Sequence, residues 1–78
     1  MVKVRLFAEA AEIAGDRVLD VEATSLEVVS NYLKQEYGKS MVEVLQTSQV
    51  WVNGQPQIET DLITSTDEVA IIPPVSGG

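Results

Sequence analysis

The chain has neither cysteine nor histidine among its 78 residues. Without thiols it can form no disulfide, thiolate nucleophile or iron–sulfur cluster, and without imidazole it also lacks the usual ligands of zinc. Histidine acid–base chemistry and Ser–His–Asp catalysis are excluded for the same reason. The reactive side chains that remain are carboxylates, hydroxyls, lysines and tyrosines. The sequence is therefore poor in the groups that enzymes use.

Positive charge is scarce as well. Five basic residues face twelve acidic ones, which gives a formal net charge of −7. Such a chain repels phosphate backbones, so we expect no nucleic-acid partner. All the basic residues precede residue 40, and the second half carries acidic residues alone: Glu43, Glu59, Asp61, Asp67 and Glu68. A partner that docks on that half is expected to present basic groups. The acidic residues lack the spacing of a calcium loop, so we expect no metal site.

Long hydrophobic runs are also missing. No apolar stretch approaches the roughly 20 residues of a membrane span. The first residues, 2–6, alternate between apolar and basic side chains and do not form a signal-peptide core. We therefore expect a cytoplasmic protein with no membrane partner.

The first half of the chain reads as strand, helix, strand and main helix. Residues 2–6 alternate as in a strand with one buried face, which residues 7–8 extend, and residues 9–14 form a short helix that ends at Gly15. Residues 18–21 are expected to pair antiparallel with the first strand. Residues 24–27 have the form of a capping box with Thr24 as the N-cap. The main helix that follows has one apolar face and ends at Gly38; its apolar residues are Leu26, Val29, Leu33 and Tyr37.

The second half supplies a shorter helix and the rest of a sheet. Residues 40–45 are helical, residues 50–52 form a strand, and Asn53-Gly54 is a strong hairpin signal. Pro56 limits the returning arm to an edge, and residues 62–63 suggest a small buried turn. Residues 68–72 are apolar after Glu68, as in a central strand buried on both sides. This order predicts an α+β fold, a β-grasp (ubiquitin-like) roll with a mixed sheet packed on one main helix.

The segment 73–78 is the informative part for function. We divide the chain into a β-grasp domain, residues 1–72, and an extended, flexible Gly-Gly tail, residues 73–78. The two prolines favour an extended arm that leaves the sheet. Gly77 and Gly78 have no β-carbon, so they fit a channel too narrow for other residues. The free carboxylate of Gly78 becomes electrophilic when it is activated as an acyl-adenylate, and it can then accept sulfur or an amine.

Three stretches resemble the small subunit of molybdopterin synthase, the sulfur-carrier subunit of the molybdopterin-converting factor. They are residues 6–8 (Leu-Phe-Ala) with Glu12 and Gly15, residues 52–54 (Val-Asn-Gly), and the closing run 67–78. The resemblance extends over essentially the whole chain, and the closing Pro-Pro-Val-Ser-Gly-Gly is its most specific part.

The resemblance implies a sulfur-donating subunit that is no enzyme on its own and binds no cofactor. A partner enzyme that uses Mg-ATP would adenylate Gly78, and a sulfur donor protein would convert it to a thiocarboxylate. The large subunit would hold the catalytic residues, take up the tail and receive the sulfur for cyclic pyranopterin monophosphate, within a heterotetramer. The partner-binding residues would be Gly77, Ser76, Val75, Pro74, Pro73 and Phe7.

Three other functions remain open from the sequence. The chain can be a thiamine-type sulfur carrier, a ubiquitin-like protein modifier joined to lysines, or a passive interaction domain whose glycines are incidental. Phe7 is equally consistent with a core aromatic residue.

Overall fold

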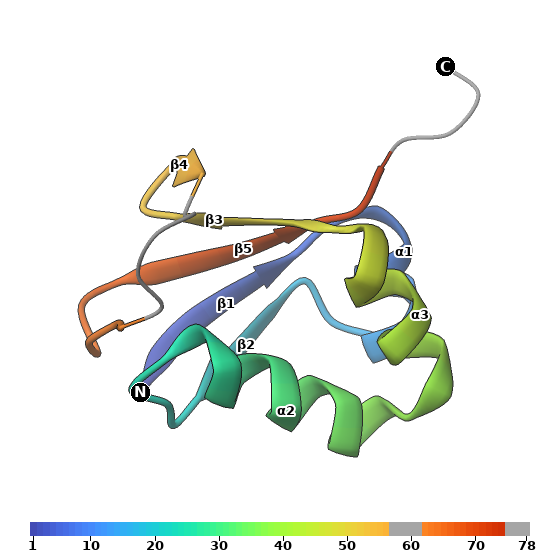
Figure 1. The fold of residues 1–78 in the computed structure, drawn as a ribbon, viewed down its shortest axis with the longest axis horizontal. Coiled ribbons are helices and arrows are strands. Elements are labelled where there is room, and N and C mark those ends of the chain that lie inside the picture. The colour runs from blue at the N-terminus through green and yellow to red at the C-terminus, as the bar shows by residue number, and fades with distance from the viewer. Residues whose placement is uncertain (57–61, 75–78) are drawn as a thin grey trace.

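The computed structural model describes residues 1–56 and 62–74. Its five strands form one mixed sheet in the order β2-β1-β5-β3-β4 (Figure 1). In chain order the elements are β1 (Val2–Leu6), α1 (Ala8–Ala14), β2 (Val18–Val21), α2 (Leu26–Tyr37), α3 (Lys39–Thr47), β3 (Gln49–Val52), β4 (Gln55–Pro56) and β5 (Glu68–Ile72). No helix in the described part of the chain is long and apolar enough to cross a membrane.

The centre of the sheet is the pair β1 and β5, which come from opposite ends of the chain. The two strands run parallel, with Lys3 opposite Glu68 and Leu6 opposite Ile71. β2 pairs antiparallel with β1, and β3 pairs antiparallel with β5. A mixed sheet in this order, crossed by a main helix, is the β-grasp fold, so the predicted fold class and the central position of β5 are confirmed.

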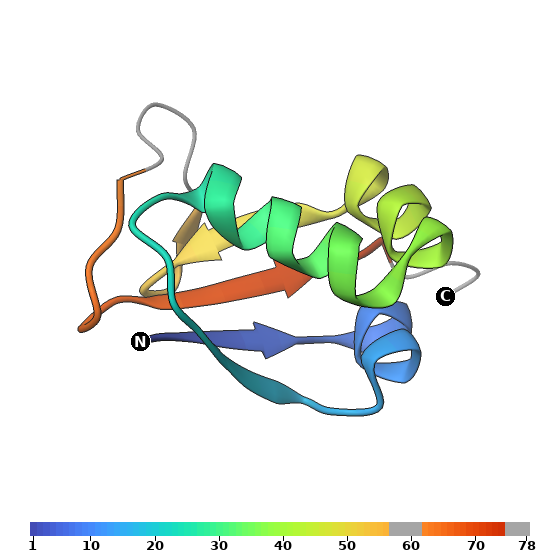
Figure 2. The same cartoon turned by 90° about the horizontal axis from the view of Figure 1, so that it is seen from below.

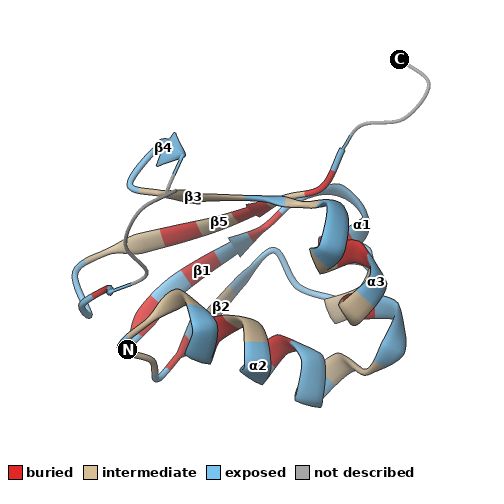
Figure 3. Cartoon of the chain, in the orientation of Figure 1, coloured by how far each residue is buried: buried red, intermediate tan, exposed pale blue. Residues whose placement is uncertain are grey.

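The core lies between the sheet and the helices, which lie on one side of the sheet (Figure 2). Val4, Leu33 and Met41 are fully buried there, and burial alternates along the central strands (Figure 3). In β5 Val69 and Ile71 are buried, whereas the alternate residues remain partly exposed. The prediction that β5 is buried on both sides is therefore wrong, because no described element covers the outer face of the sheet.

The main helix α2 begins with a side-chain N-cap, but the N-cap residue lies one position later than the capping box predicts. The Oγ atom of Ser25, not that of Thr24, accepts a hydrogen bond from the backbone N–H of Val28 at 3.2 Å. Glu27 then occupies the second helical position, where its negative charge interacts favourably with the positive end of the helix dipole. The predicted inner face is confirmed at Val29 and Leu33, which are both buried.

Two turns complete the frame. The Asn53-Gly54 hairpin is confirmed, with positive φ at both residues (53° and 81°) as a type I′ turn requires. The expected buried turn at 62–63 is half right. Ile63 is buried and donates its N–H to the carbonyl of Thr24, whereas Leu62 is 75% exposed. Leu62 forms a β-bridge with Ser25, so the backbone is extended here and successive side chains point to opposite sides. Ile63 therefore faces the core and Leu62 faces outward.

Candidate functional site

The chain leaves the sheet at the end of β5, beside α1 (Figure 1). Pro73 is still buried, and Pro74 is the first exposed residue after the strand. A proline at this point has no N–H to continue the sheet ladder, which ends the strand. The remaining predicted site residues, Val75, Ser76, Gly77 and Gly78, lie outside the described residues.

Phe7 lies at the same end of the sheet. Its backbone N–H donates to the carbonyl of Ile71 at 3.2 Å, which joins the segment after β1 to the end of β5. Phe7 itself has an extended backbone before α1, and Ala8 then takes a positive φ of 50°. This reversal turns the chain away from the sheet and leaves the Phe7 side chain 46% exposed. Phe7 is therefore not a core aromatic residue.

A strip of partly exposed apolar side chains leads along the open face of the sheet to this end. Trp51 is directly opposite Ala70 in the β3–β5 ladder, and Gln49 is opposite Ile72. Opposed residues in an antiparallel pair share one face, and Ala70 and Ile72 belong to the half of β5 that faces away from the core. We call Trp51, Ala70, Ile72, Phe7 and Pro74 the apolar strip. The apolar strip reaches the point at which the chain leaves the sheet.

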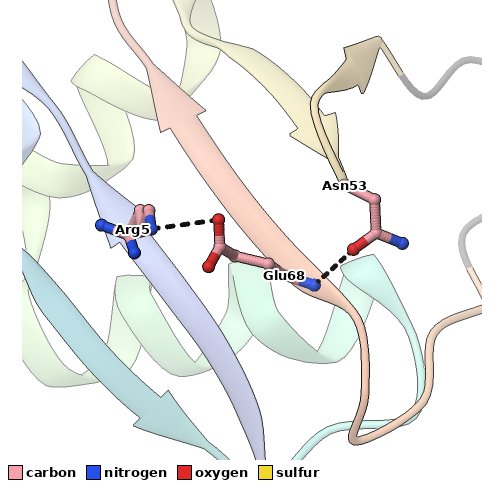
Figure 4. Close-up of polar contacts among 3 residues, drawn as sticks. All are labelled: Arg5, Asn53 and Glu68. Carbon is pink, nitrogen blue, oxygen red and sulfur yellow. Dashed lines mark hydrogen bonds and ion pairs between the residues drawn. The ribbon is translucent and has the colours of Figure 1, made fainter.

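Polar contacts frame the strip on the same face. The Nε atom of Arg5 lies 3.0 Å from the carboxylate of Glu68, across the β1–β5 pair (Figure 4). The backbone N–H of Glu68 donates to the side-chain oxygen of Asn53 at 2.9 Å. Both partners of the ion pair are nearly half exposed, so its contribution to stability is about 0–1 kcal/mol. Its main effect is to hold the two side chains beside the strip.

Two of the stretches on which the family resemblance rests, Asn53-Gly54 and Asp67-Glu68, contact each other. The Asn53 amide donates to Asp67 at 2.9 Å, and the Asn53 N–H donates to the carbonyl of Glu68 at 2.8 Å. Asp67 also accepts the N–H of Thr64 at 2.8 Å. The hydrogen bond from Asn53, with that from Thr64, lowers the pKa of Asp67. These residues lie away from the tail, at the other end of β5, and fasten the hairpin to the turn before it.

No group of three or more acidic residues in the described parts of the chain is arranged to hold a metal ion. Asp67 and Glu68 are engaged in the contacts above, while Glu59 and Asp61 lie outside the described residues. The structure thus brings Phe7, Pro73 and Pro74 together at one end of the sheet. Sequence reasoning missed the other members of the apolar strip, although the Glu-Val-Ala-Ile-Ile pattern places alternate residues of β5 on that face.

Solved structures of similar fold cover nearly the whole chain. Small archaeal modifier protein 1 from Methanosarcina acetivorans has 27% sequence identity and a TM-score of 0.83, over 99% of this chain and 95% of that one. The protein of the same name from Haloferax volcanii has 26% identity and a TM-score of 0.80, over 99% and 98%.

A third similar structure is a complex of subunits 1 and 2 of the molybdopterin-converting factor from Helicobacter pylori 26695. Its identity is 22% and its TM-score 0.71, over 99% of this chain and 97% of that one, so this likeness concerns the fold. No curated protein sequence matches the chain. The ThiS family matches residues 4–78. The chain therefore belongs to the ThiS family of ubiquitin-like sulfur carriers.

Proposed function

We propose that the chain is the sulfur-carrier subunit of a molybdopterin synthase, with Gly78 as the residue that carries the sulfur. The observation that carries the proposal is the point at which the chain leaves the sheet, at Pro73 and Pro74. The central strand β5 ends at Ile72, the sequence continues as Pro-Pro-Val-Ser-Gly-Gly, and the open apolar strip extends to Pro74, the last residue that the structure describes. This arrangement combines a surface for a partner with an arm that reaches into it. It requires no catalytic side chain on this chain, in agreement with the poverty of reactive groups.

The chemistry starts at the Gly78 carboxylate. Its negative charge resists nucleophilic attack, and oxide is a poor leaving group. An activating enzyme with Mg-ATP transfers AMP to one carboxylate oxygen and releases pyrophosphate. A persulfide on a donor protein then attacks the carbonyl carbon, and AMP leaves with that oxygen. A second thiol cleaves the resulting S–S bond, forms a disulfide with the donor and leaves the outer sulfur on Gly78. The product is a terminal thiocarboxylate, whose sulfur the large subunit transfers to cyclic pyranopterin monophosphate.

Each predicted site residue has a role in this scheme. Gly77 and Ser76 pass through the narrow channel of the partner, because small residues allow the backbone a close approach. Val75, Pro74 and Pro73 set the direction of the arm, since proline restricts φ to about −65°. Phe7 packs against the partner at the base of the arm, where an exposed aromatic ring is a strong anchor.

A second candidate function is protein modification. It is favoured by the 26–27% identity to the small archaeal modifier proteins 1 over almost the entire chain. The two functions share the activated Gly78 and differ in the acceptor, which is a lysine amine in modification. A thiamine-type carrier would again form the thiocarboxylate but pass its sulfur to a thiazole precursor.

The test is the intact mass of the chain after incubation with Mg-ATP, the cognate activating enzyme and a sulfur source. We expect one oxygen to be replaced by sulfur, with the change localised to Gly78 by fragmentation. A chain lacking Gly78 and one with an added terminal residue serve as matched controls and should stay unmodified while remaining folded. An unchanged wild-type mass, with the enzyme active on a known carrier, would refute the carrier role.

The acceptor is then identified with the thiocarboxylated chain. Conversion of cyclic pyranopterin monophosphate to molybdopterin in the presence of the large subunit supports the synthase role. Ladders of conjugates of higher mass in cell extract, without that conversion, would replace it with protein modification. Gly77→Ala should slow the conversion, because its methyl group must enter a narrow channel, and turnover at the wild-type rate would contradict such a channel.

A further inference from the structure

A groove of about 400 Å³ lies at the end of the sheet where the tail begins. It is lined by Arg5, Leu6, Phe7, Ala8, Ala11 and Arg17, from the end of β1, the start of α1 and the residue before β2. Because Phe7 is hydrogen-bonded to Ile71 near the end of β5, the groove adjoins the point at which the chain leaves the sheet. A protein that engages the tail therefore lies within reach of this groove.

The walls of the groove are fixed by the backbone. The N–H of Leu6 donates to the carbonyl of Arg17 at 2.8 Å, which holds Arg17 beside the end of β1. On the other side the positive φ of Ala8 turns α1 away from the sheet and leaves Phe7 exposed. Ala8 and Ala11 have only a methyl group each, so α1 adds little bulk to the groove. A non-glycine residue at positive φ is uncommon and costs about 1 kcal/mol or more, and such strain is characteristic of binding sites.

The charge of the groove is opposite to that of the molecule. Two of the five basic residues in a chain of net charge −7 line it. Arg17 is exposed and forms no ion pair within residues 1–56 and 62–74, while Arg5 contacts Glu68 through Nε. Arg17 also borders a wider hollow of about 620 Å³ beside the groove, and the acidic residues Glu12 and Asp16 line that hollow but not the groove itself.

We propose that this groove binds an acidic segment of the protein that receives the tail, with a carboxylate on Arg17 and Arg5 and an apolar side chain against Phe7. The inference extends the proposed function, because it assumes that a partner covers this end of the sheet. Guanidinium groups form directional, charge-assisted hydrogen bonds to carboxylates, and the ring of Phe7 supplies apolar contact next to them. Charge complementarity at this position fixes which way the carrier faces when the tail enters its partner.

This gives the carrier two surfaces of opposite sign. The second half of the chain is acidic and is expected to meet basic groups, whereas the groove selects acidic ones. A partner that matches both can dock in one orientation only, since rotation would set like charges against each other.

The test is a titration of the ¹⁵N-labelled full chain, followed by NMR at low salt. The probe is the peptide acetyl-Glu-Leu-Glu-Phe-amide, and the matched control peptide carries Gln in place of both Glu residues. We expect saturable shifts of the amides of Phe7, Ala8, Ala11 and Arg17 with the acidic peptide. Arg17→Gln should weaken binding about fivefold, the upper range for one exposed ion pair, and Arg17→Glu should abolish it. The matched reversal Lys39→Glu, at the exposed start of α3, should leave binding unchanged.

Several results would overturn the proposal. Equal shifts with the Gln peptide would show that the groove does not recognise the negative charge of the peptide. Shifts centred on other residues would show that the peptide binds outside the groove. The same shifts with inorganic phosphate would reduce the groove to a site for any anion. Shifts at the groove on removal of residues 75–78, without peptide, would show that the chain's own tail is the occupant. The titration involves no activating enzyme, so its failure is separate from a failure of Gly78 to accept sulfur.

Discussion

Replacement of Gly38, which joins α2 to α3, tests whether its backbone conformation is required. Gly38 has φ 79° and ψ −153°, a region that only glycine enters at low cost. A β-carbon on it would have no heavy atom within 4 Å, so the cost of Gly38→Ala is torsional and involves no clash. The torsional cost is about 1–3 kcal/mol, and the stiffer unfolded chain offsets about 0.4–1 kcal/mol of it. The net loss is about 1–2 kcal/mol.

D-alanine at the same position is the matched control, in a chemically synthesised chain. For a D residue these angles mirror φ −79° and ψ 153°, which is ordinary extended backbone. The variant then keeps the entropic gain without the strain and should be stabilised by about 0.4–1 kcal/mol. Thermal unfolding followed by circular dichroism should place L-alanine about 10 °C below the wild type and D-alanine a few degrees above it. If both alanines shift Tm in the same direction, the assigned conformation of Gly38 is wrong.

Three further predictions concern the core, the acidic turn and the apolar strip. Leu33→Ala removes a side chain with no exposed surface and should lower the free energy of unfolding, measured with urea, by about 3 kcal/mol. Val28→Ala, on the exposed face of α2, should change it by no more than about 0.5 kcal/mol. Equal losses in the two variants would contradict the packing of α2. The lowered pKa of Asp67 means that its ionised form is favoured in the folded state. The stability that it contributes is complete above its unfolded pKa of about 3.9 and is lost as pH falls through the lower folded value. Asp67→Asn should therefore flatten the decline of Tm below about pH 4, and parallel curves would rule out that contribution. Phe7→Ala should keep the free energy of unfolding within about 1 kcal/mol of the wild-type value and weaken binding to the tail-receiving partner about tenfold. A fully stable variant with unchanged binding would show that Phe7 is not part of the interface.

Much of the fold follows from local patterns in the sequence. Alternation gives β1, helical spacing gives the buried face of α2, and Asn-Gly gives the hairpin because both residues accept positive φ. The errors came where two adjacent residues have the same chemistry. Thr24 and Ser25 can both cap a helix, and the sequence does not show which of the two takes the extended conformation that precedes it. Leu62 and Ile63 are both apolar, and only the bridge to Ser25 decides which one points inward.

The site was harder to predict than the fold, for a physical reason. Apolar runs look the same whether they are covered by another layer or left open for a partner. Residues 69–72 are such a run, and the partial exposure of Ala70 and Ile72 becomes visible only once all helices are seen on the opposite side of the sheet (Figure 2). The groove beside Phe7 could not be read from the sequence either, because Arg5 and Arg17 are separated by α1 and come to line one groove only through the antiparallel pairing of β1 with β2.

The parallel pairing of β1 with β5 has a consequence for the synthesis of the protein. During translation, β1, β2 and all three helices are synthesised before residue 68, whereas β5, the strand that lies between β1 and β3, is synthesised after them. Val4 and Leu6 stay without their central neighbour until β5 emerges, and the distant pairing makes this step the slow one. A chain truncated before β5 therefore has no complete sheet. Until β5 is translated, β1 and β3 each present an unpaired edge, so this is the interval in which the growing chain is most exposed to pairing with another chain.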